Sequence, residues 1–390
     1  MIARATPRPR SRTPRTGTES VALLPTVVPS VVRAMHMPST RPMLVVHRTM
    51  RTDATPTTRD ALLADATLSG AWEVMTPAAA TAALQRRMHT PRRDRVLVHD
   101  VDMVSYLPGE QCVLRFMVQT RGHVTAWMGI VHAQDRALRT SHTRHRLWNA
   151  GLRSLPKPLG VVPELQLRFE DALDGEALLD AMHTTRSVPR LADAVLRVLR
   201  TTSELPVLPE ASWSAVDAVR LATRAFDAAA RTSVAQRGLV ERLHAIAEPL
   251  RARCETGVIY RTLRPTQLLL RHGRIRVREV EQVAFGDPAL DVGALIGHLI
   301  VHGWQRPADR LAARALAAQL LERAVRMAPE SWAASAVSRY ACLTVARCLE
   351  ESRSQAASCR VGRRGGATIT LEAMLGAVET DGSIAALLAP

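Results

Sequence analysis

The pattern of apolar and polar positions alternates in the first half of the chain. Three alternating runs cover residues 95–107, 111–119 and 124–133. Turn residues separate them: Pro108 and Gly109 lie after the first run, and Arg121 and Gly122 after the second. A period of two is typical of half-buried strands, and short turns containing glycine join antiparallel neighbours. The sequence therefore predicts an antiparallel meander over residues 95–133, followed by one further strand at 165–173.

Helical spacing of apolar positions dominates the rest of the chain. The predicted helices are 60–87 with a break near Pro77, 134–148, 187–204, 213–230, 234–254, 308–327, 332–350 and 370–378, while 353–366 is predicted to be a loop. The chain should therefore have a small β part followed by a mainly helical part.

A central stretch, residues 258–300, combines both periods. It predicts strands at 258–260 and 268–270, a turn at His272 and Gly273, and an alternating strand that reaches Glu279. Asp287 followed by Pro288 is typical of a helix start, with Asp287 as the N-cap and an apolar helix behind it. The pattern predicts a polar loop held on a rigid frame.

Composition changes this picture mainly at the beginning of the chain. Residues 1–58 are rich in Arg, Pro and Thr without a sustained period, which predicts a disordered tail. Ten arginines up to Arg59 face only Glu19 and Asp53, so about half of the net charge of +16 lies in this segment. The remaining charge is dispersed, which argues against specific nucleic-acid recognition.

The cysteines and the apolar runs indicate the compartment. The chain has 5 cysteines, widely spaced and without a Cys-x-x-Cys pair, as expected of reduced thiols rather than of disulfides or a zinc site. No apolar run reaches the roughly 20 residues that span a bilayer. We expect a cytoplasmic protein that does not enter the membrane.

The central stretch resembles the aminoglycoside phosphotransferase-like family of the protein kinase-like fold. That family has His-Gly-Asp-Leu-x-Pro-x-Asn, then Ile-Asp-Phe-Asp/Glu, then Gly-Asp-Pro-x-x-Asp-Leu. The matching positions, without a gap, are Leu263, Pro265, Gly286, Asp287, Pro288 and Asp291. The resemblance implies an α+β bilobal fold: a small antiparallel N-lobe over residues 59–170, a helical C-lobe over 171–352, and a loop and helix over 353–390.

The chemistry of the motif differs from the family at each catalytic position. Thr262 stands at the catalytic aspartate, Gln267 at the metal-binding asparagine and Glu279 at the metal-binding aspartate. Glu281, two residues further along the same strand, could rebuild a metal site with Glu279, or both could be solvated or paired with arginines. Asp287 and Asp291 have a structural explanation as carboxylates at a helix N-terminus.

The small lobe departs in the same way. Where the resemblance implies the phosphate-binding lysine, the chain has Ile130, and the helix predicted at 134–148 contains no glutamate to pair with a lysine. The resemblance also places Glu170 at the nucleotide site. The lysine and its partner are therefore missing together.

These replacements favour a degraded phosphotransferase, a pseudokinase that binds a partner protein, a peptide or a small molecule. The alternative is an active ATP-dependent kinase for a hydroxyl group, with Gln267, Glu279 and Glu281 as rearranged metal ligands. ATP and Mg²⁺ are the cofactors that the resemblance implies, and the sequence leaves both open.

Overall fold

The computed structural model describes residues 61–62, 64–87, 96–133, 136–206, 211–230, 234–253, 257–278, 283–355 and 364–389. Within these ranges, side chains are not described at 225–230, 234–236, 350–355 and 364–370. All described residues belong to one compact unit, Pro56–Pro390. The tail predicted at residues 1–58 lies outside the described residues, as do Glu279 and Glu281.

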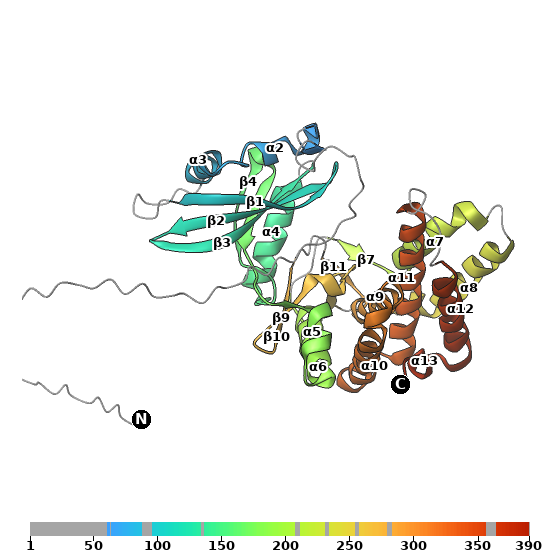
Figure 1. Ribbon diagram of the computed structural model, residues 1–390. Helices are drawn as coiled ribbons and strands as arrows, with labels where there is room; N and C mark the ends of the chain where they lie inside the picture. The colour runs from blue at the N-terminus through green and yellow to red at the C-terminus, as the bar shows by residue number, and fades with distance from the viewer. Residues whose placement is uncertain are drawn as a thin grey trace, which may run out of the picture. The chain divides into compact units, whose positions relative to one another are not determined.

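The predicted meander is present and forms most of a five-stranded antiparallel sheet (Figure 1). Its strands are β1 (Leu97–Leu107), β2 (Gln111–Thr120), β3 (His123–His132), β4 (Pro158–Val162) and β5 (Leu167–Asp171), in the order β1-β2-β3-β5-β4. In the register of β3 with β5, Ile130 lies opposite Arg168 and Met128 opposite Glu170. Ile130 and Glu170 therefore share one face of the sheet.

The two faces of this sheet are covered by different helices. One face packs against the N-terminal elements η1 (Ala66–Leu68), α2 (Ser69–Trp72) and α3 (Pro77–Arg87), in a cluster that includes Phe116 and Phe169. The next residue after Phe169 points to the opposite face, where Glu170 forms an ion pair with Arg144 of α4 (Arg136–Asn149). The face of Ile130 is thus closed by α4.

Two small sheets carry the central stretch. One contains β6 (Glu176–Ala177), β9 (Leu268–Arg271) and β10 (Arg274–Val277); the other contains β7 (Ser212–Trp213), β8 (Gly257–Ile259) and β11 (Ala284–Gly286). The predicted turn between β9 and β10 is present, and both His272 and Gly273 have positive φ, of 48° and 71°. Two central residues with φ above zero match the twist that a tight hairpin requires.

The remaining helices form the C-lobe. They are α5 (Leu178–Thr184), α6 (Val188–Ser203), α7 (Ala215–Ala230), α8 (Val234–Arg251), α9 (Ala289–Gln305), α10 (Arg310–Met327), α11 (Ala334–Gln355), α12 (Arg364–Asp381) and α13 (Ala385–Leu388). Short 3-10 turns η3 (Pro163–Leu165), η4 (Pro265–Gln267) and η5 (Pro307–Asp309) connect the larger elements. A small antiparallel lobe and a helical lobe confirm the predicted α+β bilobal fold.

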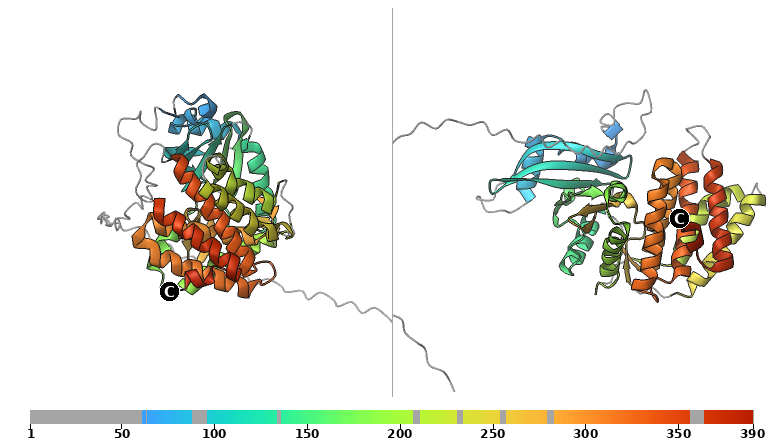
Figure 2. Two further views of the ribbon diagram at one scale, coloured as in Figure 1. Left: turned by 90° about the vertical axis from the view of Figure 1, so that its right-hand side faces the viewer. Right: turned by 60° about the horizontal axis from the view of Figure 1, so that its bottom comes forward.

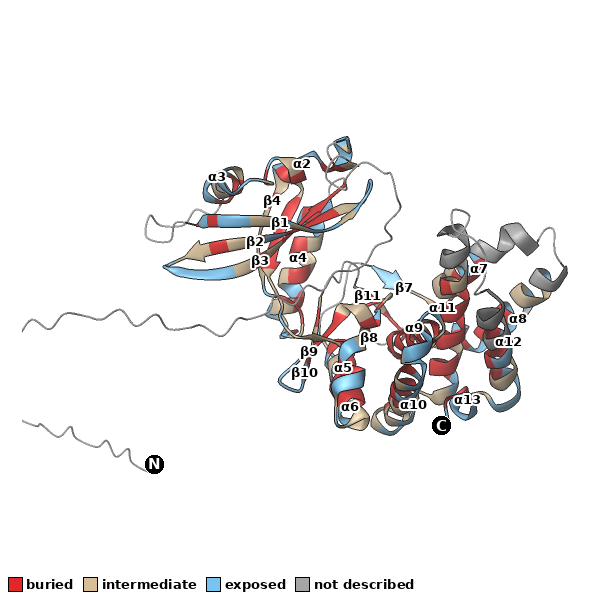
Figure 3. Ribbon diagram, in the orientation of Figure 1, coloured by how far each residue is buried: buried red, intermediate tan, exposed pale blue. Residues whose placement is uncertain are grey.

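Helix α9 is the centre of this lobe, because buried residues follow its length (Figure 3). It packs closely on α11, and Figure 2 shows the two helices side by side with α10. A Cβ at Gly293 would lie 2.5 Å from Tyr340 Cβ, and one at Gly297 would lie 2.8 Å from the Ala341 carbonyl oxygen. These two glycines therefore allow the close approach.

Several predicted boundaries were wrong. Helix α12 begins at Arg364, within the loop predicted at 353–366, and runs past the predicted end at 378; α11 continues to Gln355. The low helix propensity of Gly365 and Gly366 concealed this start in the sequence. Trp213, predicted to begin a helix, lies instead in β7. No helix among the described residues is long and apolar enough to cross a bilayer.

Candidate functional site

The loop between β8 and η4, residues 260–264, is hydrogen-bonded to the first turn of α9. Asp291, in the first turn of α9, accepts a hydrogen bond at 2.7 Å from the Tyr260 backbone N–H. The Tyr260 hydroxyl lies 2.8 Å from Thr202 Oγ1 of α6, and both side chains are buried. Two helices of the C-lobe core thus set the position of the loop.

The environment of Asp291 changes its acidity. The side chain is buried and has no ion pair with any described residue. Burial raises the pKa of Asp291 to about 7, although the backbone N–H groups of Tyr260 and Arg261 act in the opposite direction. Near neutral pH the Asp291 carboxyl group is therefore partly protonated.

Thr262, which the resemblance places at the catalytic aspartate position, lies in a tight turn. Its backbone N–H donates to the Tyr260 carbonyl oxygen at 2.7 Å. The residue between them, Arg261, has a φ of 63°, in the left-handed region that disfavours side chains with a Cβ. The backbone turns sharply here, but a threonine hydroxyl cannot accept a proton from an acceptor alcohol as a carboxylate does.

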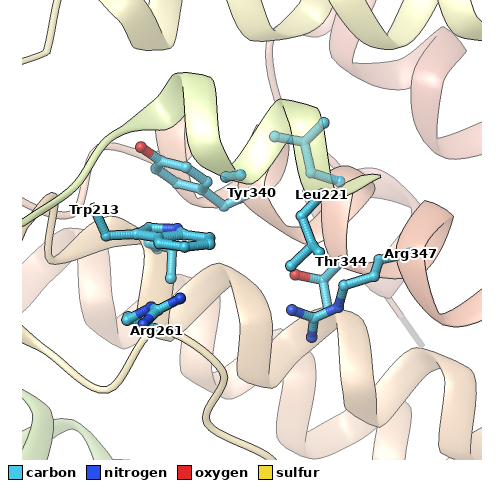
Figure 4. Close-up of a pocket in the computed structure, with 9 residues that line it drawn as sticks. Trp213, Leu221, Arg261, Tyr340, Thr344 and Arg347 are labelled. Atoms are coloured by element: carbon cyan, nitrogen blue, oxygen red, sulfur yellow. The ribbon is translucent and has the colours of Figure 1, made fainter. Parts of the chain in front are cut away.

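Arg261 lines a small pocket on the C-lobe side of this turn (Figure 4). Its guanidinium stacks on the Trp213 ring, with Cζ 3.8 Å from the ring centroid. The pocket also contacts Tyr340, Thr344 and Arg347, and its volume of about 20 Å³ has room for one water molecule. Both charged residues of the described lining are arginines, so the pocket favours a neutral or anionic group.

One guanidinium nitrogen of Arg261 has an unmet hydrogen bond within the described part of the chain. Its Nε is buried and has no hydrogen-bond partner among the described residues. Burial lowers the pKa of Arg261, while Asp217 acts in the opposite direction. The sequence signal for this residue was a large side chain where the family has glycine. The partner Trp213 lies 48 positions away and carries no signal of its own.

Gln267, predicted as a metal ligand, uses its amide oxygen within the protein. Gln267 Oε1 accepts a hydrogen bond at 2.8 Å from the Arg264 backbone N–H and so caps the start of η4. The other two predicted metal ligands, Glu279 and Glu281, lie outside the described residues. Among the residues that the structure describes, no group of three acidic, histidine or cysteine side chains could hold a metal ion.

Asp287 is engaged on both of its carboxylate oxygens. Oδ1 accepts a hydrogen bond at 3.0 Å from the Ala289 backbone N–H, and Oδ2 lies 2.5 Å from Arg253 Nε. The Tyr340 hydroxyl donates to Oδ2 at 3.3 Å. Asp287 therefore accepts the hydrogen bond of the first residue of α9 and joins this helix start to Arg253, just after α8, and to Tyr340 of α11.

The face of the sheet that holds Ile130 carries a buried charge network. Glu170 forms ion pairs with Arg168 and with Arg144, the latter at 3.2 Å, and Arg168 Nε donates to His132 Nε2 at 3.0 Å. Ile130 itself is buried. The polarity of the expected lysine–glutamate pair is reversed, because here the helix supplies the cation and the sheet supplies the carboxylate.

Burial and charge set the protonation states in this network. Burial alone raises the pKa of Glu170, but Arg144 and Arg168 outweigh burial and hold the pKa below its usual value. Burial, aided by Arg168 and other arginines, lowers the pKa of His132 to about 3. Glu170 is therefore ionised, and His132, which accepts the hydrogen bond from Arg168, is neutral. The charge of the carboxylate predicted to face a nucleotide is thus balanced by arginines of the same lobe.

The turn between β1 and β2, where the resemblance implies the phosphate loop, is also engaged. The Gly109 backbone N–H donates to Asp65 Oδ2 at 2.8 Å, and the Tyr106 hydroxyl donates to the same oxygen at 3.0 Å. Asp65 is the residue before η1. A carboxylate of the chain thus accepts the hydrogen bond that a phosphate oxygen would need.

The described residues at these positions do not fit a complex of Mg²⁺ and nucleotide. Mg²⁺ prefers carboxylate and other oxygen ligands in an octahedral arrangement, and nucleotide phosphates need cations. Gln267 caps η4 and Ile130 carries no charge, while Glu279 and Glu281 lie outside the described residues. These replacements are visible in the sequence, but the contacts that Arg144 and Arg168 make with Glu170, and Asp65 with Gly109, are not.

Comparison with known proteins gives likenesses of structure alone. No protein-family model matches the sequence, and no curated protein sequence gives a significant match. Among solved structures, a thermostable mutant of aminoglycoside phosphotransferase APH(4)-Ia, in ternary complex with AMP-PNP and hygromycin B, has a TM-score of 0.52 and 14% identity, over 77% of this chain and 99% of its own.

Two further solved structures are similar. The apo form of a thermostable mutant of the same phosphotransferase has a TM-score of 0.50 and 16% identity, over 77% of this chain and 99% of its own. A choline/ethanolamine kinase family protein from Mesorhizobium loti has a TM-score of 0.49 and 12% identity, over 82% and 98%. The phosphotransferase likeness confirms the predicted protein kinase-like fold.

Proposed function

We propose that the chain is a cytoplasmic pseudokinase of the aminoglycoside phosphotransferase-like type, which binds a small molecule, a peptide or a partner protein and does not transfer phosphate. The observation that carries the proposal is the reversed ion pair beside Ile130. With Glu170 bound by Arg144 and Arg168, the sheet offers a nucleotide neither a lysine nor a free carboxylate. Phosphoryl transfer relies on such positioned charges.

The loop side supports the same proposal. Thr262 cannot serve as the base, and loss of a general base alone lowers a rate by about 10²- to 10⁴-fold. Gln267 already caps η4, and the Asp287 carboxylate is bound to Arg253 and to the start of α9. Of the described positions that the chemistry would use, one is thus replaced by Thr262 and another, Gln267, is used to hold the fold.

The charge near Arg261 restricts the class of ligand. The fold neighbour binds hygromycin B, and aminoglycosides are cations at neutral pH. The described lining beside Trp213 offers Arg261 and Arg347 and no carboxylate. These two arginines therefore disfavour a cationic aminoglycoside beside this lining.

Nucleotide binding is the test of the proposal. A nucleotide with a micromolar Kd would stabilise the protein at millimolar concentration by about 4 kcal/mol, which raises the melting temperature by several degrees. We expect no such shift for the full chain with ATP and Mg²⁺, and no phosphate release in an ATPase assay. An active aminoglycoside phosphotransferase, measured in parallel, serves as the positive control.

The same measurement includes the alternative of an active kinase. A shift with Mg²⁺ and ATP that disappears in Glu279→Ala or Glu281→Ala would favour rearranged metal ligands and overturn the pseudokinase proposal. Glu204→Ala, an exposed carboxylate of the C-lobe paired with Arg200, is the matched control that should leave any shift unchanged.

A further inference from the structure

A cavity lies at the C-terminal end of α9, away from the loop at residues 260–264. Its walls come from α9, α10, α12 and the segment that includes α13, and its volume is about 240 Å³. Pockets for small molecules usually measure about 300 to 1,000 Å³, so this cavity is close to the lower end of that range. It is large enough to hold an organic molecule rather than single waters.

The interior of the cavity is apolar. Leu299 of α9, Met374 of α12 and Ile384 before α13 line it, and all three are buried. Trp304 lines it near the end of α9 and is partly exposed. A hydrocarbon group that entered the cavity would be removed from water on several sides.

The charge at the cavity has one sign. Arg310 and Arg314 are the charged residues of its described lining, and they are four residues apart in the first turns of α10, hence on one side of the helix. Like charges at this spacing repel each other, and the N-terminus of α10 adds positive partial charge.

No described carboxylate neutralises these two arginines. Asp309, the residue before Arg310, is bound by two histidines: Oδ1 lies 3.1 Å from His183 Nε2, and Oδ2 lies 2.8 Å from His302 Nε2. Arg314 donates a hydrogen bond to the Ala389 carbonyl oxygen, which is neutral. An anion at this position would therefore relieve the repulsion.

We infer that this cavity binds a small amphipathic anion, whose apolar body lies among Leu299, Met374 and Ile384 and whose anionic head group lies between Arg310 and Arg314. Along α9, Asp291 and Gly303 are 12 residues apart, which corresponds to roughly 18 Å. The site is therefore distinct from the loop at Thr262, and it does not depend on the pseudokinase proposal.

The test compares ligands that differ only in the head group. Decanoate, decyl phosphate, decanol and decyltrimethylammonium are titrated into the full chain by calorimetry, below the concentration at which they form micelles. We expect both anions to bind at least tenfold more tightly than the cation, with decanol in between, and a negative heat-capacity change from apolar burial. Comparison of the two anions distinguishes a carboxylate head group from a phosphate.

Variants locate the site. The double substitution Arg310→Gln with Arg314→Gln should weaken decanoate about tenfold and leave decanol within twofold. Arg326→Gln, an exposed arginine of the same helix paired with Glu322, is the matched control and should change neither. Leu388→Trp, which fills the cavity, should abolish binding of both ligands.

Fluorescence adds an independent readout. A bromine-labelled decanoate should quench the fluorescence of Trp304, and Trp304→Phe should remove that part of the quenching.

Equal affinity for the anions and the cation, or unchanged binding in Leu388→Trp, would contradict the inference, and so would the absence of binding to the wild type. Because Arg310 and Arg314 are exposed, their substitution keeps the test decisive even if Leu388→Trp does not fold.

Discussion

The sheet side and the loop side of the candidate site each bury a carboxylate, but in different electrostatic surroundings. Glu170, 4% exposed, lies between Arg144 and Arg168, and these guanidiniums offset burial and keep its pKa low. Asp291, 3% exposed, is held by backbone N–H groups without a cationic partner, and burial raises its pKa to about 7. With similar burial, Glu170 is thus ionised at neutral pH, whereas Asp291 is partly protonated.

The two sides also differ in how far their polar groups are paired within the protein. On the sheet side the Glu170 carboxylate forms ion pairs with Arg144 and Arg168, so a nucleotide would have to compete with these ion pairs before it could bind there. On the loop side Arg261 Nε remains without a hydrogen-bond partner among the described residues, and Asp291 titrates near neutral pH.

The largest expected effect comes from the removal of the sheet-side carboxylate. Glu170→Gln keeps the shape of the side chain but leaves two buried guanidiniums beside each other without an anion. Loss of one partner of a buried pair lowers the free energy of unfolding by about 3 to 5 kcal/mol. Urea denaturation of the variant should show this loss as a lower midpoint with an unchanged slope.

An exposed ion pair provides the control for this change. Glu204→Gln removes the partner of Arg200 at the C-terminal end of α6, where both side chains are about half exposed or more. The effect there should be within about 1 kcal/mol. If Glu170→Gln were equally mild, the sheet-side charges would not form the closed network described above.

The loop-side carboxylate should instead make stability depend on pH. The folded state raises the pKa of Asp291 from 3.8 to about 7, so folding binds a proton between these values. The contribution of Asp291 is therefore fully present below about pH 4 and is lost as the pH rises to about 7. A shift of this size corresponds to at most about 4 kcal/mol.

Asp291→Asn separates this linkage from other titrations, because Asn keeps an oxygen for the Tyr260 N–H and does not titrate. The free energy of unfolding of the wild type, relative to Asp291→Asn, should fall between pH 4 and pH 8. Asp193→Asn, which changes a partly exposed carboxylate paired with Arg323, should not produce a fall in this direction. A constant difference across the range would mean that Asp291 is ionised throughout.

The sequence was sufficient for the fold because the signals that define it are local. Pro108 with Gly109, and Arg121 with Gly122, marked the turns of the meander, and the spacing from Leu263 to Asp291 marked the loop and α9. The structure keeps these elements within a few residues of the predicted bounds. Helix α12 was predicted at 370–378 but begins at Arg364, because Gly365 and Gly366 have low helix propensity and concealed its first turn.

Two partners at the candidate site, Arg144 and Asp65, could not be predicted, because their contacts join residues that are distant in sequence. Arg144 meets Glu170 only when α4 covers the sheet, and Asp65 meets Gly109 across 44 positions. The sequence shows that a glutamate is missing from 134–148, but not that an arginine of that helix binds a carboxylate from β5. The missing glutamate can be read from the sequence, whereas the ion pair between Arg144 and Glu170 depends on the tertiary structure.

The smallest expected effect concerns Arg261, whose left-handed backbone and stacking on Trp213 act in opposite directions. Glycine at this position relieves about 1 to 2 kcal/mol of backbone strain and loses about 0.5 to 1 kcal/mol of cation–π attraction, so Arg261→Gly should change the free energy of unfolding by about 1 kcal/mol or less. Arg261→Ala loses the stack without the relief and should be less stable than Arg261→Gly by about 1 kcal/mol. At Arg197, an exposed position within α6, the order should reverse, with Ala more stable than Gly by about 1 kcal/mol. Urea denaturation of the four variants measures both differences, and the same order at the two positions would show that the loop side stores no backbone strain.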